Sequence, residues 1–167
     1  KTVAALYPSL EYAANNGKTV FFLTSRLSQH KIAIETLKKM AGADNADSNA
    51  DNNADKIRSI DLIGKKWLCS HDVQDMDSSM FSNHCSALIR ANQCKYYKNF
   101  KEKGEIKPEA QNAIILLKMK PLHSEEAKAL VGHTFCTYEL LTEAANSSNI
   151  VVADYFHIFS PHGKKFL

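Results

Sequence analysis

Four cysteines are the residues in this sequence whose type most directly indicates chemistry. Cys69, Cys85 and Cys94 fall within residues 67–97, whereas Cys136 follows much later in the chain. Four thiolates can hold a tetrahedral zinc ion or an iron–sulfur cluster, because soft ligands select these metals. No two of the cysteines form the tight CxxC pair of most structural zinc sites. The spacing therefore disfavours zinc but leaves it open.

Other interpretations of the cysteines also stay open. They could be separate buried thiols without a metal, and disulfides are the minority interpretation for a chain expected in a reducing compartment. Nearby histidines could replace one cysteine as a ligand, although a solvated or capping side chain is the commoner role of each; these are His71, His84, His123 and His133.

Composition and charge define the class of protein in which such a site would lie. The chain has 167 residues, of which 44% are hydrophobic and 23% charged, enough for one sizeable core or a core with a satellite subdomain. The formal charge of +3 is only a weak indication of a polyanionic partner. No apolar run approaches the ~20 residues of a membrane span, and no apolar core of a signal peptide follows Lys1-Thr2. We therefore expect an intracellular protein.

Hydrophobic periodicity in the first third of the chain predicts an α/β layer. A helix is expected within 1–17, a buried strand within 18–25, a second helix over 28–42 capped by Ser28, and a short strand within 57–64. Residues 43–55 contain only Ala, Asp, Asn and Ser, so we expect a flexible surface loop there. The apolar positions expected on the inner faces of the two helices are Ala4, Leu6, Leu10, Ala13, Ile32, Ile34, Leu37 and Met40.

The pattern then becomes irregular and later returns to an α/β rhythm. Short helices are expected at 86–93, 108–119 and 124–132, punctuated by Pro and Gly. A helix at 138–146 and a buried strand at 149–156 follow the last cysteine. The predicted fold class is α/β, a partial parallel-sheet layer interrupted by a small, mainly helical four-cysteine insertion. A segment so short of apolar mass often needs a covalent or metal staple.

Three stretches flanking the cysteines carry a family resemblance. LIGKKWLCSHD, RANQCKYYKNF and FCTYELLTEAANSSNIVVADYFHIFSP resemble the XPD family of superfamily 2 DNA helicases. Members carry a four-cysteine [4Fe–4S] domain inserted into the first RecA-like motor domain, so the resemblance implies that Cys69, Cys85, Cys94 and Cys136 are cluster ligands. It divides the chain into motor residues 1–64, a cluster insertion at 65–136 and a return to the motor at 137–167. Lys65 and Thr137 stand where the family commonly has Arg and Pro.

The resemblance extends to two motor motifs. Lys1 and Thr2, followed by a helix, resemble the end of a Walker A motif cut before its lysine, which implies binding of ATP phosphates and Mg²⁺. Thr24, Ser25 and Arg26, with Gln29 shortly after, resemble a motif Ia turn that contacts the backbone of single-stranded DNA. A plain helix-capping role for Ser25 or Ser28 explains those hydroxyls equally well.

A second candidate DNA contact mixes cations with aromatic rings. The stretch RANQCKYYKNFKEK places Arg90, Lys95 and Lys98 beside Tyr96, and such mixtures suit single-stranded nucleic acid because bases stack on rings while cations follow the backbone. A solvated lysine face over a small aromatic core is an equally weighted alternative. Lys65, just before the first cysteine, completes the predicted DNA-binding set.

The resemblance implies a fragment of an ATP-dependent DNA helicase, usually 5′→3′, with [4Fe–4S], ATP and Mg²⁺ as cofactors of the parent protein. Its expected partners are single-stranded DNA or a duplex–single-strand junction, a second motor domain and an arch-type insertion. The expected location is the cytoplasm of a prokaryote or the nucleus of a eukaryote. The expected process is DNA repair, transcription or replication. The printed residues contain no DEAH box, so this chain alone is expected to be inactive. The alternatives are a zinc-stapled nucleic-acid-binding module and an iron–sulfur redox protein.

Overall fold

A small parallel sheet organises the molecule. The computed structural model describes residues 2–42 and 57–159. Within them, three parallel strands lie in the order β1 (Val20–Leu23), β5 (Ile150–Ala153), β2 (Ser59–Leu62). The central strand β5 is buried along its whole length, as its β-branched run Ile-Val-Val favours. Because β5 is the last of the described strands and lies between the first two, the sheet joins segments that are far apart in the sequence.

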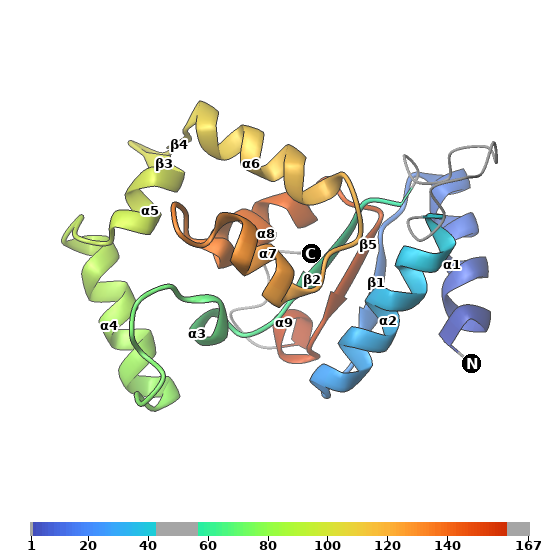
Figure 1. Cartoon of the computed structure of the whole chain (residues 1–167), viewed down its shortest axis with the longest axis horizontal. Helices are drawn as coiled ribbons and strands as arrows, with labels where there is room; N and C mark the ends of the chain where they lie inside the picture. The colour runs from blue at the N-terminus through green and yellow to red at the C-terminus, as the bar shows by residue number, and fades with distance from the viewer. Residues whose placement is uncertain (1, 43–56, 160–167) are drawn as a thin grey trace.

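Helices cover both faces of this sheet (Figure 1). On one face, α1 (Thr2–Asn16) and α2 (Leu27–Met40) pack through a core that includes Leu6, Ile34 and Leu37. On the other face lie α6 (Pro108–Lys118), α7 (Ser124–Val131) and α8 (Thr137–Ala145), with their own apolar core against β2 and β5. This is the layered arrangement of an α/β fold.

The remaining elements lie away from the covered faces. They are α3 (Lys65–Leu68), α4 (Ser78–Arg90), α5 (Lys95–Phe100), the antiparallel hairpin of β3 (Lys101–Glu102) and β4 (Glu105–Ile106), and α9 (Phe156–Phe159). Both hairpin turn residues, Lys103 and Gly104, have positive φ angles of 50° and 90°, which suits a tight two-residue turn. Figure 1 places α4 far from the sheet, and its only buried residue is Phe81.

The elements predicted from periodicity are mostly present. The three long helical patterns of the α/β part appear as α1, α2 and α8, and the three strand patterns appear as β1, β2 and β5. Two of the short helices correspond to α6 and α7, while the pattern at 86–93 matches only the second half of α4. The α/β fold class is confirmed, with a three-stranded parallel sheet that fits part of a RecA-like fold.

Three details of the prediction are wrong. Ile32 is 54% exposed, because it lies outside the buried face of α2. That face consists of His30, Ala33, Ile34 and Leu37, so a histidine occupies a position expected to be apolar. Ala4 is exposed because the stripe of α1 begins at Leu6. Ser28 does not cap α2, which already begins at Leu27 after an N-cap, Arg26, that makes no side-chain capping bond.

The predicted division into motor and insertion can be followed element by element. Residues 65–136 include α3, α4, α5 and the hairpin, and they also include α6 and α7. Those last two helices pack directly on β2 and α8 and share their core. Lys1 and the predicted loop at 43–55 lie outside the described residues.

Candidate functional site

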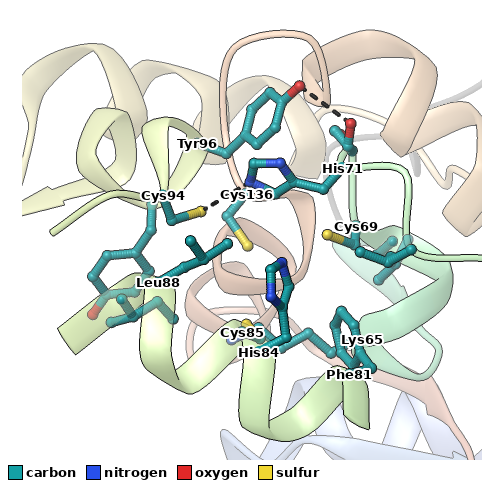
Figure 2. Close-up of a pocket in the computed structure, with 15 residues that line it drawn as sticks. Lys65, Cys69, His71, Phe81, His84, Cys85, Leu88, Cys94, Tyr96 and Cys136 are labelled. Atoms are coloured by element: carbon teal, nitrogen blue, oxygen red, sulfur yellow. Dashed lines mark hydrogen bonds between the residues drawn. The ribbon is translucent and has the colours of Figure 1, made fainter. Parts of the chain in front are cut away.

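The four cysteines line one pocket, although they come from four different elements. Cys69 directly follows α3, Cys85 lies within α4, and Cys94 and Cys136 immediately precede α5 and α8. All four are free thiols. Figure 2 shows their sulfur atoms facing a shared space, so the fold gathers the residues that the sequence keeps apart.

Two hydrogen bonds to backbone carbonyls fix the segments that carry the cysteines. The N–H of Cys136 donates to the carbonyl of Tyr96 over 3.1 Å, which ties the start of α8 to α5. The Tyr96 hydroxyl donates to the carbonyl of Ser70 over 3.2 Å, and this bond ties α5 to the segment after α3 (Figure 2). Three of the four cysteine-bearing segments are therefore cross-connected without involving a sulfur atom.

Burial favours the protonated form of two thiols in this pocket. It raises the pKa of Cys136 to about 12 and also raises the pKa of Cys85, while the nearby Lys65 ammonium opposes both shifts. Lys65 forms an ion pair with Glu139. Although burial alone would lower the pKa of Lys65, the Glu139 carboxylate raises it above its ordinary value. A metal bound here must displace the thiol protons, because thiolates are the ligating form.

Two of the four candidate histidines lie at this pocket. His71 Nε2 is 3.6 Å from Cys94 Sγ, and its ring packs edge-on against Tyr96. His84 lines the pocket from α4, and Figure 2 draws its ring among the side chains of the pocket. His123 instead caps α7 through its side chain, and His133 is exposed.

The donor set of this pocket suits a soft metal centre. Among residues 2–42 and 57–159, no three His, Cys, Asp or Glu side chains are already close enough together to form a metal site. Nevertheless, four thiols surround one pocket whose other walls are largely apolar, including Leu68, Phe81 and Leu88. Soft sulfur ligands in a shielded pocket are what iron–sulfur clusters and structural zinc use. The residues present fit either group.

The predicted motif Ia residues lie at the carboxyl end of β1. Thr24 is buried, and its hydroxyl donates to the side-chain oxygen of Gln29. The Arg26 N–H lies 3.4 Å from the same hydroxyl. Ser25, Arg26 and Gln29 are exposed, so Thr24 is the buried member of the predicted set.

The other predicted DNA contacts lie around the cysteine pocket. Lys65 and Tyr96 line it, and Lys95 Nζ stands 4.8 Å from the centre of the Tyr96 ring. Arg90 and Lys98 are exposed near the ends of α4 and α5. The predicted nucleotide-binding pair is only half described: Thr2 begins α1, whereas Lys1 lies outside the described residues.

Sequence reasoning missed a buried polar network that joins α2, the edge strand β2 and the beginning of α7. His30 Nδ1 lies 2.5 Å from Asp61 Oδ1, and both side chains are almost fully buried. The other carboxylate oxygen of Asp61 accepts from the Ser124 N–H over 2.9 Å. One signal was available, since Asp61 interrupts the apolar run of β2 and a buried carboxylate requires partners.

A comparison with protein-family models identifies the family to which this chain belongs. The DEAD_2 family model matches residues 22–167, which is most of the chain. No curated protein matches the chain. Among the described residues, no helix combines the length and apolar character needed to cross a membrane. The match begins within β1 and covers β2, β5 and the cysteine pocket, and it shows that the chain belongs to the DEAD_2 family and contains a DEAD-like helicase domain.

Proposed function

We propose that the chain is part of an XPD-type, ATP-dependent DNA helicase and that its four cysteines hold a [4Fe–4S] cluster. The observation that carries the proposal is the convergence of Cys69, Cys85, Cys94 and Cys136 on one pocket inside a DEAD-like helicase domain. Nothing in the α/β layer itself requires these cysteines to meet. Their meeting is explained if they ligate one group.

The chain's own residues would hold and shield this group. The four thiolates are the ligands, and Leu68, Phe81 and Leu88 keep water from the sulfur atoms. Lys65, held by Glu139, places a positive charge beside two of the cysteines and favours their thiolate forms. A bound cluster would supply a rigid cross-link between four segments of the chain.

DNA and nucleotide are the expected substrates of the parent helicase. A helicase domain implies nucleic-acid substrates and further helicase domains, and the exposed Ser25 and Arg26 suit contacts to a phosphate backbone. We assign 5′→3′ movement by the family resemblance. Because the printed residues contain no DEAH box, this chain by itself is expected to hydrolyse no ATP.

The test is a metal and sulfide analysis with an absorption spectrum of anaerobically purified chain. We expect a broad absorbance near ~400 nm with bound iron and sulfide. Cys94→Ser should weaken it strongly, because Cys94 is buried in the pocket. Ser86→Ala, an exposed neighbour of a predicted ligand, is the matched control and should retain the full spectrum.

A zinc-stapled nucleic-acid-binding site is the second candidate. It is favoured by one contact, His71 Nε2 at 3.6 Å from Cys94 Sγ, because mixed Cys and His ligands are typical of zinc. Colourless protein with one tightly bound zinc would support it and reject the cluster. Colourless, metal-free and well-folded protein would reject both and leave the cysteines as buried thiols.

A further inference from the structure

A second pocket lies at the carboxyl edge of the parallel sheet. Ser25 follows β1, Gly64 follows β2 and Asp154 follows β5, and all three residues line this pocket. Figure 1 shows α9, α3 and the beginning of α2 gathered toward the same end of the sheet. Open parallel sheets bind their ligands in crevices outside the carboxyl ends of the strands. This pocket is separate from the cysteine pocket and shares no lining residue with it.

Two large aromatic rings line this pocket and remain open to solvent. Trp67 of α3 is 63% exposed and Phe156 of α9 is 67% exposed. Lys66 Nζ lies 5.7 Å from the centre of the Trp67 ring. Exposed aromatic rings beside cations suit single-stranded nucleic acid, since every base has a face that can stack on a ring.

The pocket also contains a buried polar atom that needs a partner. His157 lines it, is only 8% exposed, and has an Nδ1 atom with no hydrogen-bond partner among the described residues. Burial is the main cause that lowers the pKa of His157, while the Asp154 carboxylate and hydrogen bonds to the backbone of Asp154 and Ile63 oppose the shift. A buried nitrogen of this kind gains from a ligand that brings a polar edge to it.

Charge distribution indicates which part of a nucleic acid would enter. The carboxylate of Asp154 lines the pocket and accepts from the Phe156 N–H over 2.8 Å, which holds it in place. An anion at that position repels a phosphate but tolerates a neutral base. The exposed Arg26 lies next to Ser25, outside the lining set, where a phosphate could be bound.

We propose that this pocket receives one unpaired base of single-stranded DNA, stacked on Trp67 and Phe156 with its polar edge toward His157 Nδ1. The proposal rests on the proposed helicase function and names a base-binding site within it. The site adds stacking to the phosphate contacts expected of Ser25 and Arg26. It predicts that affinity for a single strand depends on the presence of bases as well as on charge.

The experiment measures binding of the chain to two fluorescein-labelled oligonucleotides of equal length and charge by fluorescence anisotropy. One is oligo(dT), and the other has abasic sites in place of the bases. Trp67→Ala should weaken oligo(dT) binding about tenfold and leave abasic binding unchanged, while Trp67→Phe should retain most of the affinity. Tyr12→Ala is the matched control, because Tyr12 is a 65% exposed ring on α1 that does not line the pocket.

Each outcome decides the proposal. Unchanged oligo(dT) affinity in Trp67→Ala and Phe156→Ala would overturn the base site while leaving the helicase proposal standing. An equal loss for both oligonucleotides would show that the rings do not act through the bases and would also overturn the site. Failure of the unaltered chain to bind either strand would overturn the site together with the DNA-binding part of the proposed function. The metal analysis tests the cluster independently. Far-ultraviolet circular dichroism confirms that each variant is folded. We expect the Trp67 variants to fold, because the Trp67 side chain is exposed.

Discussion

Removing the Asp61 carboxylate should destabilise the molecule more than any surface change. Asp61 lies in β2, between α2 and the beginning of α7. Its side chain is 0% exposed, with His30 Nδ1 at 2.5 Å and the Ser124 N–H at 2.9 Å. The perturbation is Asp61→Ala, which leaves His30 and the Ser124 N–H without their acceptor and removes the carboxylate that lies 3.5 Å from His123 Nε2.

The expected loss is about 3 to 5 kcal/mol. Breaking a buried polar pair by removing one partner typically costs that amount, and each buried group left unsatisfied accounts for roughly 1 to 3 kcal/mol of it. A domain of this size is stable by only about 5 to 15 kcal/mol, so a large share of its stability is at stake. The melting temperature should fall by about 10 °C.

Thermal melting and urea denaturation, both followed by circular dichroism, measure this loss. Asp61→Asn should cost less, because its amide oxygen can still accept from the Ser124 N–H. Asp75→Ala removes an exposed carboxylate and should change stability by less than about 0.5 kcal/mol. In a double-mutant cycle with His30→Ala, the two losses should not add, because the residues are in direct contact. A loss below about 1 kcal/mol in Asp61→Ala, or strict additivity in the cycle, would refute the reasoning.

Three further changes have definite expected outcomes. Asp77→Ala removes the N-cap of α4, whose carboxylate accepts from two backbone N–H groups at 2.8 Å, and should cost about 1 kcal/mol; unchanged amide hydrogen exchange in α4 would contradict this. Leu140→Ala opens a cavity in the core against the sheet and should lower the free energy of unfolding by about 2 to 5 kcal/mol, measured by urea denaturation. Leu130→Ala, at a half-exposed position, should lower it little. Equal losses in the two variants would contradict this prediction. Burial lowers the pKa of His157 in the folded state, so the unfolded chain takes up a proton first and stability should fall as pH drops below about 6.5. His157→Gln should show a shallower fall between pH 7 and 5 in pH-dependent melting, and an identical slope would exclude the effect.

The α/β part of the fold was predictable because its residues obey simple periodicities. The run Val20–Leu23 and the run Ile150–Ala153 are continuous apolar segments, which is what strands covered on both faces require. The prediction failed where a polar residue occupies an apolar place. His30 belongs to the buried stripe of α2 only because Asp61, distant in the sequence, provides its partner. Periodicity within one helix contains no information about such a partner.

The sequence predicted which cysteines form the site but not how the fold holds them together. Residue type alone makes all four cysteines candidate metal ligands, and in the structure they line one pocket. The bond between the Cys136 N–H and the Tyr96 carbonyl, which helps to align them, joins two backbone groups, and any residue type except proline could donate it. The pocket of Trp67 and His157 was missed for a related reason, because it forms where the ends of three strands meet and no local motif marks it.

The fold supports the segments around the cysteines unequally. The segment that returns to Cys136 is held by α6 and α7, which pack on β2 and α8 through a shared apolar core. Helix α4, which carries Cys85, buries only Phe81 and lies far from the sheet (Figure 1). Because so little apolar surface fixes α4, its position depends more on the cysteine pocket than that of α8 does. Three cysteines are therefore positioned by segments joined through hydrogen bonds to backbone carbonyls. Cys85 is the one whose placement gains most from a group that all four thiols share.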